Sequence, residues 1–85
     1  MFDYSPLMGK IVEKYGTQLN FSLAMGLSER SVSLKLNNKV RWKDTEIVKA
    51  CELLGIQPEN MYRYFFKLKV HDSRTILRGV KNGNT

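Results

Sequence analysis

Residues Ser28 to Leu34 have the types and the spacing to bind the edges of DNA bases. If they form a helix whose Val32 points into a core, successive side chains turn by about 100°, so Arg30 and Leu34 fall on the far side. Arginine can make two hydrogen bonds to guanine, and an apolar side chain can pack on the methyl group of thymine. The candidate base-reading residues are Ser28, Glu29, Arg30, Ser33 and Leu34.

Three of these residues also have an ordinary structural interpretation. Leu34 could be a further core residue, although Val32 and Leu36 already offer an inner pair at helical spacing. Arg30 could be a solvated surface charge, although its place near the start of the helix favours a contact in a DNA groove. Glu29 could accept a hydrogen bond from cytosine or simply hold Arg30 in place. We favour base reading for Arg30 and Leu34.

Around this stretch, the sequence divides residues 4–66 into five short helical segments. Ser5 is the expected N-cap of the first helix, Pro6 its first residue and Gly16 its end. The apolar face expected for this helix consists of Leu7, Met8, Ile11, Val12 and Tyr15.

The next two helices are joined by only three residues. Thr17 is the expected cap of a helix from Gln18 to Met25, and Ser28 caps one from Glu29 to about Leu36. Gly26 lies in the connection, where a glycine lets two helices cross at a steep angle, and Ser22 is small enough for a close approach. The residues expected to hold both helices to the domain are Phe21, Met25, Leu27, Val32 and Leu36.

The rest of the chain is predicted as a loop, two helices and a basic extension. Residues 37–42 are polar and basic, which predicts a loop. A fourth helix is expected over 43–54, with Gly55 at its end, and Pro58 opens a short fifth helix. Residues 66–70 alternate apolar and basic side chains, which predicts a strand that residues 74–77 could pair with in a hairpin. The alternatives for residues 67–85 are a dimer contact and a flexible basic tail.

Composition predicts one small basic domain. The chain has 85 residues and a formal net charge of +6, with an isoelectric point near 9.7. This charge suits nucleic acid or an anionic membrane surface, although many small proteins are basic without such a partner. Cys51 is the only cysteine, so no disulfide can form within the chain. With no stretch near ~20 apolar residues and no signal-peptide pattern at the start, we expect a cytoplasmic protein.

Residues 17–37 resemble the helix-turn-helix of Cro/CI-type, lambda-repressor-like regulators of phages and bacteria. The resemblance rests on Thr17-Gln18, on Ser22, on Gly26-Leu27-Ser28 and on Ser31-Val32-Ser33. More narrowly, the start Tyr4-Ser5-Pro6-Leu7, the Trp42-Lys43 step and the Tyr64-Phe65-Phe66 end resemble short Cro-like or modulator-of-repression proteins of Gram-positive temperate phages.

Two residues depart from the pattern of these regulators. Ser22 stands where alanine is more usual, but its size is similar. Lys35 stands where many relatives have an apolar residue. We therefore expect Leu36 to take over its packing and to rotate the second helix of the pair slightly.

The resemblance implies a compact all-α, five-helix domain over residues 1–66, followed by a basic extension over residues 67–85. It also implies that Gln18 binds a phosphate, together with the exposed N–H groups of its helix N-terminus. Such contacts position a protein on DNA without reading the sequence. The expected phosphate-binding residues are Thr17, Gln18, Asn37, Lys39, Arg41 and Lys43, although the basic ones could simply form a solvated surface.

Five large side chains crowd into residues 61–66, too many for one short helix to bury in a small core. Because exposed aromatic patches usually mark interfaces, we expect a partner or dimer interface here. Its residues are Met61, Tyr62, Tyr64, Phe65 and Phe66. Elsewhere, Trp42 is expected to pack under the preceding loop, and Cys51 to be a buried small hydrophobe instead of a reactive thiol.

The sequence offers little for catalysis. His71 has no second histidine or cysteine near it, so neither a metal nor another cofactor is expected. The Gly26–Arg30 stretch lacks the second glycine of a hydrolase nucleophile elbow, and no phosphate-binding glycine loop is present. We therefore expect a regulator and not an enzyme.

Two main functional hypotheses follow. The first is a Cro-like repressor of a lysis/lysogeny switch, which binds double-stranded operator DNA as a homodimer. The second is a modulator of repression, which acts mainly by binding a CI-type phage repressor. A third, binding to RNA or to a membrane surface, is weaker because the helices lack long one-sided basic faces.

Overall fold

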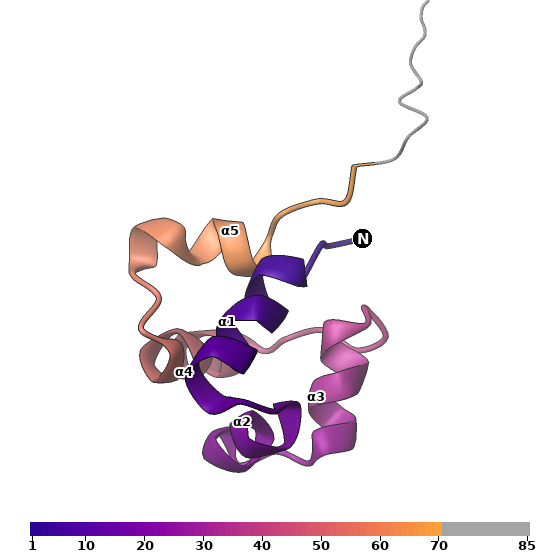
Figure 1. Ribbon diagram of the computed structural model, residues 1–85. Coiled ribbons are helices and arrows are strands. Elements are labelled where there is room, and N and C mark those ends of the chain that lie inside the picture. The colour runs from indigo at the N-terminus through magenta and orange to yellow at the C-terminus, as the bar shows by residue number, and fades with distance from the viewer. Residues whose placement is uncertain (71–85) are drawn as a thin grey trace, which may run out of the picture.

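The computed structural model describes residues 1–70, and Figure 1 shows them as a set of short packed helices. The helices are α1 (Ser5–Tyr15), α2 (Gln18–Met25), α3 (Glu29–Leu36), α4 (Asp44–Leu54) and α5 (Met61–Phe65), with a 3-10 turn, η1 (Pro58–Asn60), directly before α5. No strand occurs within residues 1–70, so the expected all-α, five-helix architecture is confirmed. Within this range, no helix combines the length and the apolar character that crossing a membrane requires.

Helix α1 crosses the front of the molecule in the view of Figure 1 and contacts α2, α4 and α5. Helix α2 also packs against α3 and α4, while α5 lies at the top of the molecule in Figure 1 and adds Phe65 to the same core. The core contains the apolar face of α4 and most of the residues expected to hold the α2–α3 pair to the domain. Its apolar side chains include Leu7, Ile11, Phe21, Met25, Val32, Leu36, Ile47, Ala50, Cys51, Leu54 and Phe65.

Local hydrogen bonds set the ends of α2 and α3 where the sequence predicted them. The Thr17 hydroxyl accepts from the Asn20 N–H at 3.1 Å, and the Ser28 hydroxyl accepts from the Ser31 N–H at 3.0 Å. Each satisfies one of the free N–H groups of a helix start. Gly26 ends α2 with φ 75°, a left-handed conformation that glycine adopts at low cost.

The start of α1 differs from the expectation. Ser5 is the first residue of the helix and Tyr4 occupies the N-cap position. The Ser5 N–H donates to Asp3 Oδ1 at 3.0 Å, so the carboxylate two residues earlier does the work expected of the Ser5 hydroxyl. The apolar face is also narrower than predicted: Leu7 and Ile11 are buried, whereas Met8 and Val12 are exposed.

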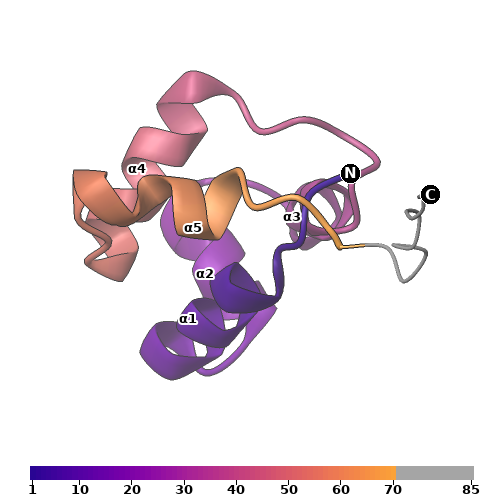
Figure 2. The same cartoon turned by 90° about the horizontal axis from the view of Figure 1, so that it is seen from above.

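The strand expected over residues 66–70 is replaced by a single antiparallel bridge between Phe2 and Leu68. The Asp3 N–H donates to the Lys67 carbonyl at 2.7 Å, and the Lys69 N–H donates to the Met1 carbonyl at 3.0 Å. The start of the chain thus takes the place of the expected pairing partner, and Figure 2 shows the segment after α5 passing beside it. Residues 71–85, with His71 and the expected return strand, lie outside the described residues.

Candidate functional site

The α2–turn–α3 unit, defined as residues 17–37, has a tight connection. The Leu27 N–H donates to the Ser22 carbonyl at 3.0 Å, which closes the end of α2. Ser22 is buried, as expected for the small residue of a close approach. Its hydroxyl donates to the Leu19 carbonyl at 2.7 Å, so burial leaves it paired.

Helix α3 has a buried face and a solvent-facing face, with Val32 on the inner side as the sequence predicted. Val32 and Leu36 are buried, whereas Glu29 and Arg30 are exposed. Ser33 and Leu34 are half-buried, so each still offers part of its surface. Within residues 1–70, Arg30 makes no ion pair, and Glu29 therefore does not hold it in place there.

Both serines of the candidate base-reading set have hydroxyl groups that are engaged within the chain: Ser33 Oγ accepts from Asn37 Nδ2 at 3.5 Å, and Ser28 is part of a cap. The Ser28 hydroxyl makes two hydrogen bonds. It accepts from the Ser31 N–H and donates to Ser31 Oγ at 3.0 Å. Its visible role is to cap α3. Ser28 is exposed like Glu29 and Arg30, whereas Ser33 and Leu34 are half-buried.

The residues expected to bind phosphate lie on two segments. Thr17 and the half-buried Gln18 begin α2, and the exposed Lys39, Arg41 and Lys43 follow α3. Asn37 is partly committed to its own helix, because its Nδ2 donates to the Ser33 carbonyl at 2.8 Å. The three exposed cations form the basic part of this surface.

Lys35 has a role that sequence reasoning missed. Its side chain is only 6% exposed, with Nζ 3.2 Å from Glu46 Oε1 and 3.2 Å from the Arg41 carbonyl oxygen. Leu36 is buried as predicted, so the two neighbours share the packing instead of one replacing the other. The ion pair ties the end of α3 to the start of α4. The signal in the sequence was the pair of acidic residues, Asp44 and Glu46, in the first turn of the next helix.

Glu46 is held in its charged form. Burial raises the pKa of this carboxyl, but the hydrogen bond from the Lys43 N–H and the nearby Lys35 ammonium outweigh it, so the pKa lies below its ordinary value. The Lys43 N–H donates to Glu46 Oε1 at 2.8 Å. The buried Lys35 therefore keeps its counter-ion at neutral pH.

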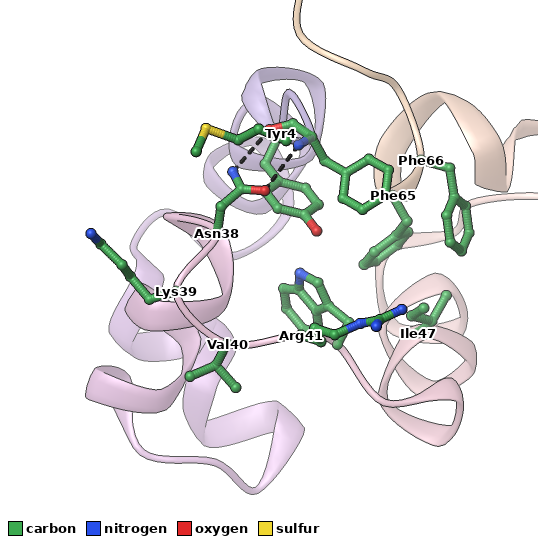
Figure 3. Close-up of a pocket in the computed structure, with 11 residues that line it drawn as sticks. Tyr4, Asn38, Lys39, Val40, Arg41, Ile47, Phe65 and Phe66 are labelled. Atoms are coloured by element: carbon green, nitrogen blue, oxygen red, sulfur yellow. Dashed lines mark hydrogen bonds between the residues drawn. The ribbon is translucent and has the colours of Figure 1, made fainter.

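A cavity of about 290 Å³ lies between the first residues, the loop after α3 and α5 (Figure 3). Trp42 and Phe65 both line this cavity, and their rings pack edge-on with centroids 5.4 Å apart. The Trp42 Nε1–H is buried and has no partner among the described residues, although buried N–H groups are normally paired. We call this hollow the aromatic cavity; its aromatic lining is Phe2, Tyr4, Trp42, Phe65 and Phe66.

Asn38 closes one side of the aromatic cavity. The Phe2 N–H donates to Asn38 Oδ1 and Asn38 Nδ2 donates to the Phe2 carbonyl, both at 2.9 Å (Figure 3, dashed lines). Asn38 has φ 62°, a left-handed conformation that asparagine tolerates better than most residues. Sequence reasoning missed this contact because its partners are 36 residues apart.

The predicted interface over residues 61–66 needs one correction. Phe65 is a core residue, because its ring packs on Trp42 and it is 2% exposed. It therefore cannot face a partner. Met61 and Tyr64 are half-buried, and Tyr62 and Phe66 present exposed aromatic surface.

Cys51 is buried as expected, and this burial raises the pKa of its thiol.

Comparison with known proteins adds two findings. The model of a family described as "Protein of unknown function (DUF739)" matches residues 1–68. The chain is also similar to the modulator of repression (MOR) of the temperate bacteriophage TP901-1 from Lactococcus lactis, known from a solution structure. Identity is 63%, the match covers 82% of this chain and 95% of that one, and the TM-score is 0.70. A search of curated proteins found no match.

These findings separate the two resemblances drawn from the sequence. The narrower one, to a phage modulator of repression, is confirmed. The wider one, to Cro/CI-type regulators, stays a prediction.

Proposed function

The chain belongs to the DUF739 family, and we propose that it works as a modulator of repression in a temperate phage. The observation that carries this proposal is the 63% identity to a phage modulator of repression, over 95% of that protein. We infer that the partner is a CI-type phage repressor, which the chain binds directly in the host cytoplasm. This role requires binding and no catalytic step, so the protein is not an enzyme.

The loop after α3 and the aromatic cavity support this proposal as a binding surface. Val40 and Phe66 line the cavity and are 44% and 37% exposed, so they offer apolar area to a partner. The outward face of α3 adds the half-buried Leu34 beside Arg30. Apolar and aromatic area with an arginine near it is typical of protein interfaces.

Mixing the chain with the repressor encoded beside it tests the proposal. We expect one complex on a size-exclusion column, and a change in how the repressor shifts its operator in a gel. Val40→Asp should weaken the complex at least tenfold, about 1.4 kcal/mol, because a carboxylate would be desolvated in the contact. Val48→Asp is the matched control, since Val48 is 51% exposed on α4.

The outcomes distinguish the partner from the surface. If the unmodified chain forms no complex, the proposed function is wrong. If Val40→Asp and Val48→Asp bind the repressor equally well, the partner stands and the assigned surface is wrong.

Direct DNA binding is a second candidate, favoured by the exposed Arg30 on α3 with Lys39, Arg41 and Lys43 following it. In this interpretation the α2–turn–α3 unit is a helix-turn-helix, and a homodimer would bind half-sites about 34 Å apart. A gel shift with the chain alone decides between the two functions. A shift that weakens with Arg30→Ala but not with Lys14→Ala, an exposed lysine of α1, would favour this second function.

A further inference from the structure

A second hollow, of about 300 Å³, lies between α1 and α5 and shares no residue with the aromatic cavity or with α3. We call it the basic groove. Its lining carries three cations, Lys10, Arg63 and Lys67, against one carboxylate, Glu13. Pro6, Gly9 and Tyr64 complete it.

The cations of the basic groove form at most weak ion pairs with other described residues. Lys10 Nζ lies 3.4 Å from Glu13 Oε1, and Lys67 Nζ lies 3.6 Å from Asp3 Oδ2. At least one side chain of each pair is well exposed. Such surface pairs contribute little, so an incoming carboxylate could replace them. Arg63 forms no ion pair within residues 1–70. The groove thus holds positive charge that the described part of the chain does not neutralise.

Gly9 lies in the interior of α1 and opens the groove further. A Cβ at this position would meet nothing within 4 Å, so internal packing does not require a glycine. A glycine in a helix interior also weakens the helix relative to alanine. What its missing side chain provides is room for another chain to pass close to α1.

We propose that the basic groove binds an acidic peptide segment of a partner protein. Carboxylates of the segment pair with Arg63, Lys10 and Lys67, and its backbone crosses α1 at Gly9. The ring of Tyr64 and the ring of Pro6 offer apolar walls for the methylene groups of glutamate side chains. The inference does not depend on the identity of the partner as a repressor.

The shape of the groove favours a peptide over duplex DNA. A hollow between two helices accepts side chains that protrude from a partner. Duplex DNA instead takes protruding elements of a protein into its own grooves. A peptide rich in glutamate supplies both the protruding shape and the opposite charge.

Nuclear magnetic resonance titration of the labelled full chain tests this proposal. The probe is an acetylated octaglutamate peptide, with octaglutamine and a short DNA duplex as comparisons. We expect saturable chemical-shift changes of the Gly9, Arg63 and Tyr64 amides with octaglutamate, and none with octaglutamine or with the duplex. Arg63→Gln should weaken binding about tenfold, the loss of one charge-assisted hydrogen bond. Lys39→Gln, the same charge change outside the groove, should alter it less than about twofold.

A second variant separates binding from folding. Gly9→Leu should abolish octaglutamate binding because its side chain fills the groove, while the melting temperature stays the same or rises because leucine favours helix. The proposal is overturned if Gly9→Leu binds normally, if Arg63→Gln and Lys39→Gln behave alike, or if the shifts spread equally over Lys39, Arg41 and Lys43. It is also overturned if the groove responds to the duplex and not to the peptide. None of these results bears on the repressor complex, which is measured separately.

Discussion

Lys35 buries its ammonium between the end of α3 and the start of α4, where Glu46 and the Arg41 carbonyl are its partners. Removing a cation from water costs free energy that is regained only when its partners are complete. The Arg41 carbonyl belongs to the loop that also carries Val40 and Trp42, which line the aromatic cavity, and Glu46 lies in the first turn of the helix that follows this loop. We therefore expect the ion pair to fix this loop more than it raises the net free energy of unfolding.

Lys35→Met should lower the free energy of unfolding by about 1–3 kcal/mol, because it leaves the Glu46 carboxylate without its cation. The double variant Lys35→Met/Glu46→Gln should regain most of this loss, since a pair of uncharged side chains leaves no buried charge without a counter-ion. Urea unfolding at neutral pH measures both. Strictly additive effects of the two substitutions would contradict the coupling.

The same pair predicts a dependence of stability on pH. The folded-state pKa of Glu46 is lowered from its ordinary 4.5, so its contribution is complete above that value and is lost as pH falls through the folded-state pKa. Unfolding free energies from about pH 7 to about pH 3 should therefore decline more steeply for the unmodified chain than for Glu46→Gln. Equal acid slopes would show that the carboxylate is not the group responsible.

Helix caps explain why the bounds of α2 and α3 could be predicted from the sequence. Thr17 and Ser28 each accept an N–H from the third residue after them, so the signal and its partner lie within one turn. The start of α1 was misplaced by one residue because only the Ser5 hydroxyl was expected to cap the helix, whereas Asp3, two residues earlier, accepts from the Ser5 N–H. The carboxylate reaches the free N–H and the hydroxyl does not.

Ser28→Ala should therefore destabilise the chain by about 1 kcal/mol, the usual cost of losing an N-cap. Ser5→Ala is the matched control and should change stability by less than about 0.5 kcal/mol, because its hydroxyl caps nothing. Thermal unfolding of both variants checks this contrast. Equal losses would mean that the Ser5 hydroxyl does stabilise the start of α1.

The elements and site residues that could not be predicted depend on partners distant in sequence. Lys35 pairs with a residue in the next helix, and Asn38 with Phe2. A helix as short as α5 has no clear apolar face, so periodicity could not separate the buried Phe65 from the exposed Phe66. The alternation over residues 66–70 does mark an extended segment, but nothing local showed that its partner is the chain start.

Across the whole molecule, the N-terminal residues join two segments that lie far apart in the chain. Phe2 bonds twice with Asn38 in the loop after α3, while Met1 and Asp3 bond with the segment after α5. Phe2 and Phe66 meet edge-on in the same place, with ring centroids 6.1 Å apart. Residues from all three segments thus line the aromatic cavity.

Asn38→Gly tests whether these contacts act as one unit, because glycine keeps the positive φ and removes both side-chain hydrogen bonds. We expect faster hydrogen exchange at the Phe2 amide, which loses its acceptor. We also expect it at the Asp3 and Lys69 amides, which pair the N-terminal arm, defined as residues 1–3, with the segment after α5. Asn38→Ala should be less stable than Asn38→Gly by about 1 kcal/mol, because alanine is strained at positive φ. Faster exchange at Phe2 alone would mean that the arm stays paired with the segment after α5. The loop after α3 and the segment after α5 would then separate from the N-terminal arm independently of each other. The affinity of a partner bound in the cavity would depend on the position of the loop after α3 and not on that of the segment after α5.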